Sequence, residues 1–128
     1  MTTILVVDDC QIYRHTIVHL LKKLQFNVLD ADNGLTGKQL LQQHAIDLAF
    51  IDIVMPDLNG FALCRWIKSN PQTKHIPVIF CSGKHREIDK DWAFKQGGDY
   101  FLDKPIRDQD IQQALDICLP NVTATALS

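Results

Sequence analysis

The sequence predicts a doubly wound α/β domain, in which helices pack on both faces of a parallel sheet. Three features support this. Five short apolar runs alternate with five stretches of helical apolar spacing. The run at 48–51 is apolar throughout and closed by turn residues, as in a strand buried on both faces. At 128 residues, 46% of them hydrophobic, the chain has room for one such domain and none for a second.

Each expected strand is a short apolar run rich in β-branched or aromatic residues. The first is β-branched and ends in two acids, the second precedes an Asn-Gly turn, and the third is the continuously apolar run. The fourth leads into Ser-Gly and the fifth into Asp-Lys-Pro. In chain order the expected strands span residues 3–7, 26–31, 48–51, 76–81 and 100–102.

Each expected helix has apolar residues on one stripe. Two lysines near the end of the first suit the negative end of a helix dipole. An Asn-Pro pair ends the third, and a Gly-Gly pair ends the fourth. In chain order the helices span 11–24, 35–44, 61–68, 87–96 and 108–118. Residues 1–119 are therefore expected to form the domain, and the polar stretch 120–128 a flexible C-terminal tail.

Charge and composition exclude several classes of protein. A net charge of -2 and a pI near 6.2 leave no basic patch large enough for this chain alone to bind nucleic acid. We expect no membrane association, because the N-terminus meets two acids too early for a signal peptide or a membrane span. The cysteines lack CxxC spacing and fall in apolar segments, which predicts reduced core residues and a cytoplasmic location. They are Cys10, Cys64, Cys81 and Cys118.

Polar side chains follow four of the strands, at the edge where parallel strands present their carboxyl ends. They are Asp8, Asp9, Asp52, Ser82 and Lys104. Taken alone, Asp52 would equally suit a residue that caps a strand. Three carboxylates at one edge repel one another unless a cation intervenes, and Mg²⁺ prefers carboxylate and phosphate oxygens. The group predicts a phosphorylation pocket with Asp9 and Asp52 as metal ligands. Lys104 and Ser82 would contact phosphoryl oxygens.

Four motifs occur in order along the chain: DD at 8–9, DIVMPDLNG from Asp52, CSG around Ser82 and DKP around Lys104. The spacings are 43 residues from Asp9 to Asp52, 30 to Ser82 and 22 to Lys104. In this combination residues 3–118 resemble the receiver domain of two-component response regulators. The resemblance implies a CheY-like, flavodoxin-like fold, with five parallel strands in the order 2-1-3-4-5 and five helices.

The resemblance implies that Asp52 is the phosphoacceptor, which attacks the phosphohistidine of a sensor histidine kinase or a histidine phosphotransfer protein. It also implies a Mg²⁺ cofactor, which Mn²⁺ could replace. By this analogy the metal ligands are Asp9, Asp52 and the backbone carbonyl of Val54, with Asp8 acting through a water molecule. Apart from phosphorylation and dephosphorylation of its own Asp52, the chain is not expected to be an enzyme.

Two further positions match the family's switch. The Ser82 hydroxyl would move toward a new phosphoryl group, and the Phe101 ring would follow it inward. Gly83 leaves room beside the hydroxyl. The resemblance also implies a cis peptide bond between Lys104 and Pro105.

The chain departs from the common pattern where Val54 and Lys84 flank the phosphoryl site. Neither residue is an amide or acid that orients an attacking water, so we expect slow self-dephosphorylation. If both side chains point to solvent, they do not affect the rate of self-dephosphorylation. The stretch 82–98 resembles receivers of pilus-type chemosensory systems. Within it, Ile88 and Trp92 share a helix face, which suits either a partner surface or core packing.

These expectations describe a stand-alone response regulator that switches a protein-binding face in signal transduction, in motility or taxis. The downstream protein target stays open. One alternative is a phosphate shuttle or sink in a phosphorelay. Another is the receiver part of a longer DNA-binding transcription regulator. An enzyme that acts on external phosphate esters fits poorly, because the pocket contains its own acceptor.

Overall fold

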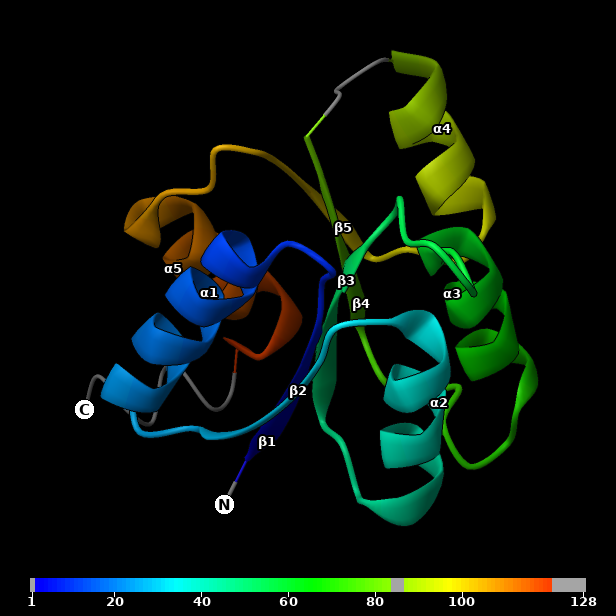
Figure 1. Cartoon of the computed structure of the whole chain (residues 1–128), viewed down its shortest axis with the longest axis horizontal. Coiled ribbons are helices and arrows are strands. Elements are labelled where there is room, and N and C mark those ends of the chain that lie inside the picture. Colours follow the sequence, from blue (N-terminus) through cyan, green and yellow to red (C-terminus); the bar gives the residue numbers. More distant parts are fainter. Residues whose placement is uncertain (1, 84–86, 121–128) are drawn as a thin grey trace.

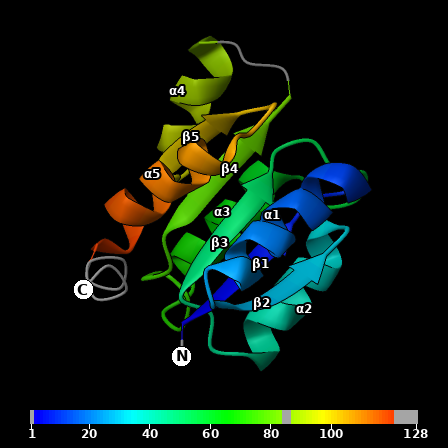
Figure 2. The ribbon, with the colours of Figure 1, turned by 90° about the vertical axis from the view of Figure 1, so that its left-hand side faces the viewer.

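The computed structural model describes residues 2–83 and 87–120, with the backbone alone for 87–89. Five parallel strands form one sheet in the order β2-β1-β3-β4-β5, as expected (Figure 2). The strands are β1 Thr3–Val7, β2 Asn27–Ala31, β3 Leu48–Asp52, β4 Val78–Ser82 and β5 Tyr100–Asp103. The helices are α1 Gln11–Lys23, α2 Gly34–Gln43, α3 Gly60–Ser69, α4 Glu87–Lys95 and α5 Asp108–Cys118.

Helices cover both faces of the sheet, as Figures 1 and 2 show. Helices α1 and α5 pack on one face, and α2, α3 and α4 pack on the other. All residues of β3 and β4 are buried, because both faces of these inner strands are covered. Strand β2 lies at the edge and buries only Ala31 fully. The two apolar layers hold the strand ends in fixed relative positions.

Several elements begin or end one or two residues from the expected positions, and local contacts explain the shifts of α2, α3 and β4. Helices α2 and α3 begin at the glycine of an Asn-Gly pair, because the asparagine side chain caps the helix. Asn33 accepts a hydrogen bond from Thr36 N at 2.8 Å, and Asn59 accepts one from Ala62 N at 2.9 Å. Strand β4 begins two residues later than expected, because the backbone N–H of Ile76 donates to Thr73 in a turn.

The expectation of four core cysteines is half wrong. Cys64 and Cys81 are buried, whereas Cys10 and Cys118 are only partly buried. Cys10 precedes α1 and Cys118 ends α5, so neither lies in the middle of an apolar stripe. All four thiols are free. Within the described residues, no helix is long and apolar enough to cross a membrane.

Several expectations concern residues that the structure does not describe. The C-terminal tail from residue 121 onward lies outside the described residues, as do Lys84 and the side chain of Ile88. Whether Ile88 and Trp92 form one surface is therefore not tested. The Trp92 side chain itself is 48% exposed on α4.

Candidate functional site

Three carboxylates meet at the carboxyl edge of the sheet. One oxygen each of Asp8, Asp9 and Asp52 lies within 4.8 Å of the others. The register explains this, because Val7 pairs with Ile51, so the residues that follow β1 come beside the end of β3. Asp8 is 1% exposed and Asp52 6%, whereas Asp9 is open to solvent. The structure thus brings together the acids that the sequence placed at two separate strand ends.

Lys104 reaches the same cluster from the segment after β5. Its Nζ atom lies 2.9 Å from Asp8 Oδ2 and 3.5 Å from Asp52 Oδ1. Burial would by itself lower the pKa of Lys104, but the hydrogen bond with Asp8 and the charge of Asp52 raise it overall. The backbone N–H of Lys104 donates to the Ser82 carbonyl at 2.8 Å, and the peptide bond to Pro105 is cis. Lys104 therefore carries its charge inside the cluster.

The carboxylate cluster is short of positive charge. Burial, together with the neighbouring Asp8, raises the pKa of Asp52 from 3.8 to about 7, and Lys104 opposes this only in part. Apart from the Lys104 ammonium group at 2.9 Å, the buried Oδ2 atom of Asp8 has no hydrogen-bond partner among the described residues. Oxygen ligands of this kind and number fit a hard divalent cation such as Mg²⁺. Among the described residues, Asp8, Asp9 and Asp52 are the group close enough to share a metal ion.

Two residues that sequence reasoning missed hold this arrangement together. Arg14 donates from Nη1 to the Asp8 carbonyl at 2.8 Å and from Nε to Asp30 at 3.1 Å. The ring of Tyr13 lies over the Lys104 ammonium group, with 4.5 Å between Nζ and the ring centroid. Neither contact has a sequence signal, because the partners lie on other elements. Asp8 is fixed further by Cys10, whose N–H donates to Oδ1 at 2.8 Å.

The two residues expected to form the switch lie on neighbouring strands. Ser82 ends β4 and is 4% exposed, one residue beyond Cys81, which pairs with Asp52. Phe101 lies on β5 opposite Phe80 and is 8% exposed. The aromatic ring therefore already occupies an inward position in this structure. Val54 lies in the β3–α3 connection with 71% of its side chain exposed.

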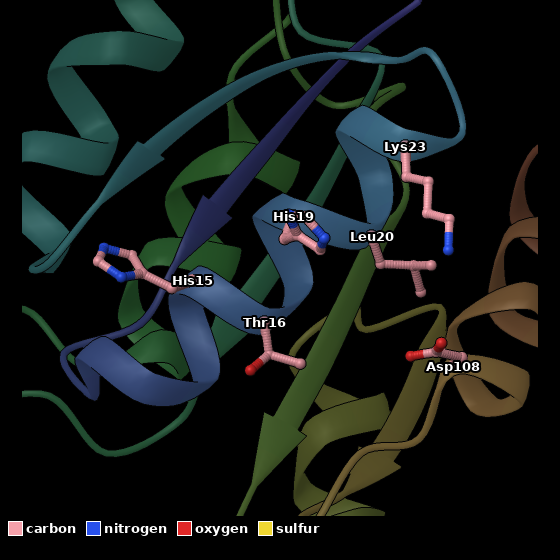
Figure 3. Close-up of a pocket in the computed structure, with 6 residues that line it drawn as sticks. All are labelled: His15, Thr16, His19, Leu20, Lys23 and Asp108. Carbon is pink, nitrogen blue, oxygen red and sulfur yellow. The ribbon is translucent and has the colours of Figure 1, made fainter.

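A groove between α1 and the start of α5 is separate from the carboxylate cluster. It has a volume of about 330 Å³ and is lined by His15, Thr16, His19, Leu20, Lys23 and Asp108. Figure 3 shows the two imidazole rings apart, with His15 turned away from Lys23 and Asp108. The groove shares no residue with the cluster around Asp52.

Comparisons with known proteins agree with the geometry. The family model for the response regulator receiver domain matches residues 4–116. Protein PilH of Pseudomonas aeruginosa is 36% identical over 119 residues, which cover 93% of this chain and 98% of PilH. Protein PilG of the same organism is 32% identical over 120 residues, which cover 94% of this chain and 89% of PilG.

One solved structure bears on the metal. It is the receiver domain of the sensor histidine kinase PA1611 from Pseudomonas aeruginosa, with a magnesium ion coordinated in its active-site cleft. The TM-score is 0.82 at 22% identity, covering 90% of this chain and 94% of that one. At this identity the likeness shows a shared fold alone.

Proposed function

Because the chain belongs to the response regulator receiver family, we propose that it is a phosphorylation switch whose acceptor is Asp52. The main support for this proposal is that a buried carboxylate lies beside a buried ammonium group. Asp52 lies 3.5 Å from Lys104 inside a group of three acids. Such a group would attract a divalent cation and, with it, the oxygens of a phosphoryl donor.

In the proposed reaction an Asp52 carboxylate oxygen attacks the phosphorus of a phosphohistidine. The phosphorus–nitrogen bond breaks, and the imidazole of the donor leaves. Lys104 and the Ser82 hydroxyl would contact the equatorial phosphoryl oxygens, where charge is spread in the transition state. No dedicated base is needed, because Asp52 attacks as a carboxylate. The donor would be a sensor histidine kinase or a histidine phosphotransfer protein.

The residues that would hold Mg²⁺ are Asp9, Asp52 and the carbonyl of Val54, with Asp8 acting through water. The bound ion would supply positive charge that offsets the carboxylates and the phosphoryl oxygens. The cluster around Asp52 supports this assignment, since three acids lie together and one buried lysine contacts two of them. Magnesium in the PA1611 receiver domain is consistent with it.

Ser82 and Phe101 would link phosphorylation of Asp52 to a change on the protein surface. The Ser82 hydroxyl would turn toward the phosphoryl group, and the face around β5 would change with it. Because Phe101 is already 8% exposed, the switch would stabilise an inward ring rather than create one. The protein that reads this face is not identified by the chain itself.

The similarity to PilH and PilG supports a place among receivers of the pilus and chemotaxis group. We place this phosphorelay in the cytoplasm, acting in motility or taxis. The match spans 98% of PilH, so PilH itself has the size of one receiver domain. A shuttle or sink would differ by passing the phosphoryl group onward to a purified histidine phosphotransfer protein.

The acceptor assignment is tested with acetyl phosphate and Mg²⁺, followed by intact-mass analysis. Wild-type protein is expected to gain one phosphoryl group, and Asp52→Asn none. Asp116→Asn, an exposed aspartate on α5, is the matched control and should behave as wild type. Unchanged phosphoryl uptake in Asp52→Asn would rule out the assignment.

A further inference from the structure

Among the described residues, the Lys104 ammonium group has neighbours of two kinds, acids and an aromatic ring. Nζ lies 2.9 Å from Asp8 Oδ2 and 3.5 Å from Asp52 Oδ1. On another side it faces the Tyr13 ring, 4.5 Å from the centroid. The Lys104 side chain is 7% exposed. An aromatic face attracts a cation through its quadrupole, so this contact adds no formal charge to the pocket.

We propose that Tyr13 is a positioning residue, whose ring holds the Lys104 ammonium group within reach of the phosphoryl oxygens on Asp52. The catalytic consequence rests on the proposed function, whereas the contact itself does not. Lysine carries its ammonium group on a flexible four-carbon stem, so its position depends on its neighbours. Asp8 also contacts Lys104, but the same carboxylate belongs to the group of acids that could hold a metal ion. An uncharged ring attracts the lysine without repelling phosphoryl oxygens.

The first turn of α1 is fixed to the sheet next to Tyr13. Arg14 donates to the Asp8 carbonyl at 2.8 Å and to Asp30 at 3.1 Å, and its side chain is only 13% exposed. These contacts join α1 to the end of β1 and to β2. Tyr13 therefore lies on a turn of helix that is tied to the sheet, which suits a residue that positions the Lys104 ammonium group.

The contact depends on the face of the aromatic ring. A conservative substitution that keeps the ring should therefore keep the contact. Tyr13→Phe keeps the ring and should keep the position of Lys104. Tyr13→Leu keeps an apolar side chain but removes the quadrupole. Trp66→Leu is a matched control, because it removes another lysine–aromatic pair, in which Lys38 lies 5.1 Å from the Trp66 ring centroid.

A first measurement reads the contact without activity or metal. Ring currents should shift the ε-methylene protons of Lys104 upfield of other lysines in NMR spectra of the metal-free full chain. Loss of the signal in Lys104→Met assigns it. The shift should persist in Tyr13→Phe and Trp66→Leu and disappear in Tyr13→Leu. An unshifted Lys104 signal in wild type would overturn the proposal.

A second measurement reads the consequence, as the rate of phosphorylation by acetyl phosphate at saturating Mg²⁺. Tyr13→Leu should lower the rate at saturating donor by about three- to tenfold, and Tyr13→Phe should stay within about twofold of wild type. Trp66→Leu should leave the rate unchanged. A Tyr13→Leu rate equal to that of wild type would overturn the catalytic role.

A double-mutant cycle shows whether Tyr13 acts through Lys104. In a Lys104→Met background, Tyr13→Leu should have no further effect on the slow residual rate. An equal loss in both backgrounds would show that the ring acts by another route and would contradict the proposal. If wild type takes up no phosphoryl group, the proposed function fails, while the NMR measurement still judges the contact.

Discussion

The Asp52 carboxylate is buried among the strand ends, yet its proposed role as phosphoacceptor requires it to be charged. Burial and the neighbouring Asp8 raise its pKa to about 7, and Lys104 only partly offsets them. Near neutral pH the Asp52 carboxyl group can therefore bind either a proton or a cation. This balance arises from single side chains, and single substitutions should reveal it.

The first prediction concerns the pH dependence of stability without divalent cations. The folded-state pKa of Asp52 is raised from 3.8 to about 7. Its contribution to stability is therefore fully present below about pH 4, and is lost as the pH rises through 7. Asp52→Asn removes the charge and should be more stable than wild type at about pH 8, by about 1–3 kcal/mol. Urea unfolding in a chelator measures this.

Near pH 4 the two proteins should unfold at similar urea concentrations, which serves as the internal control. Equal stability at the higher pH would show that the charge of Asp52 is already compensated without a metal.

The second prediction concerns the lifetime of the phosphorylated state. Val54 is 71% exposed, which on the alternative expectation would leave the rate unaffected; if position 54 does set the rate, its lack of an amide or acid leaves the attacking water unoriented. Val54→Asn should therefore speed hydrolysis of the acyl phosphate, by about three- to tenfold. Loss of phosphoryl label at neutral pH in Mg²⁺ gives the rate, and Val54→Ala should stay near wild type. A wild-type lifetime of only seconds would contradict the expectation of slow hydrolysis.

At the scale of elements, backbone contacts between the end of β3 and the start of α3 fix the position of Asp52. The N–H of Gly60 donates to the Ile53 carbonyl at 2.9 Å. A Cβ atom added at Gly60 would overlap the Asp52 carbonyl oxygen. The start of α3 and the end of β3 are therefore packed backbone against backbone, which only glycine allows here.

The third prediction tests this close approach. Gly60→Ala should lower the free energy of unfolding by about 2–4 kcal/mol, because backbone atoms must move apart. Gly83→Ala is the matched control, since the nearest atom to its added Cβ is Lys104 Cδ at 3.8 Å, an ordinary contact. Its cost should stay below about 1 kcal/mol. Equal losses in chemical denaturation would show that the close backbone approach at Gly60 does not decide the effect.

At the scale of the whole molecule, two apolar layers hold five strand ends in register, and the acids meet because of that register. Binding at the carboxylate cluster therefore acts on the whole fold. A ligand that binds only the folded state adds its binding free energy to stability.

The fourth prediction follows from this linkage. Mg²⁺ at about 100 times its dissociation constant should raise the unfolding free energy of wild type by about 2.7 kcal/mol. Asp9→Asn, which lacks one proposed ligand, should gain much less at the same concentration. Thermal unfolding with Mg²⁺ and with a chelator measures both. A gain of equal size in the two proteins would place the metal elsewhere.

The sequence by itself determined the ten elements, the strand ends that carry acids, and the motif order that indicates a receiver. These properties are local, because apolar spacing and turn residues act within a few positions of the chain. Asn33 shows the limit of local patterns, since the sequence predicts it as a turn residue and the structure shows its side chain capping α2.

Only the tertiary structure decided how the strand ends interact. The 2.9 Å contact of Lys104 with Asp8 joins residues far apart in sequence, and the Tyr13 ring over Lys104 has no local signature. The partial exposure of Cys10 and Cys118 was likewise not predictable from the sequence. Such properties depend on which surfaces meet in space. Local sequence preferences do not determine these contacts, because the register of the sheet decides which distant residues become neighbours.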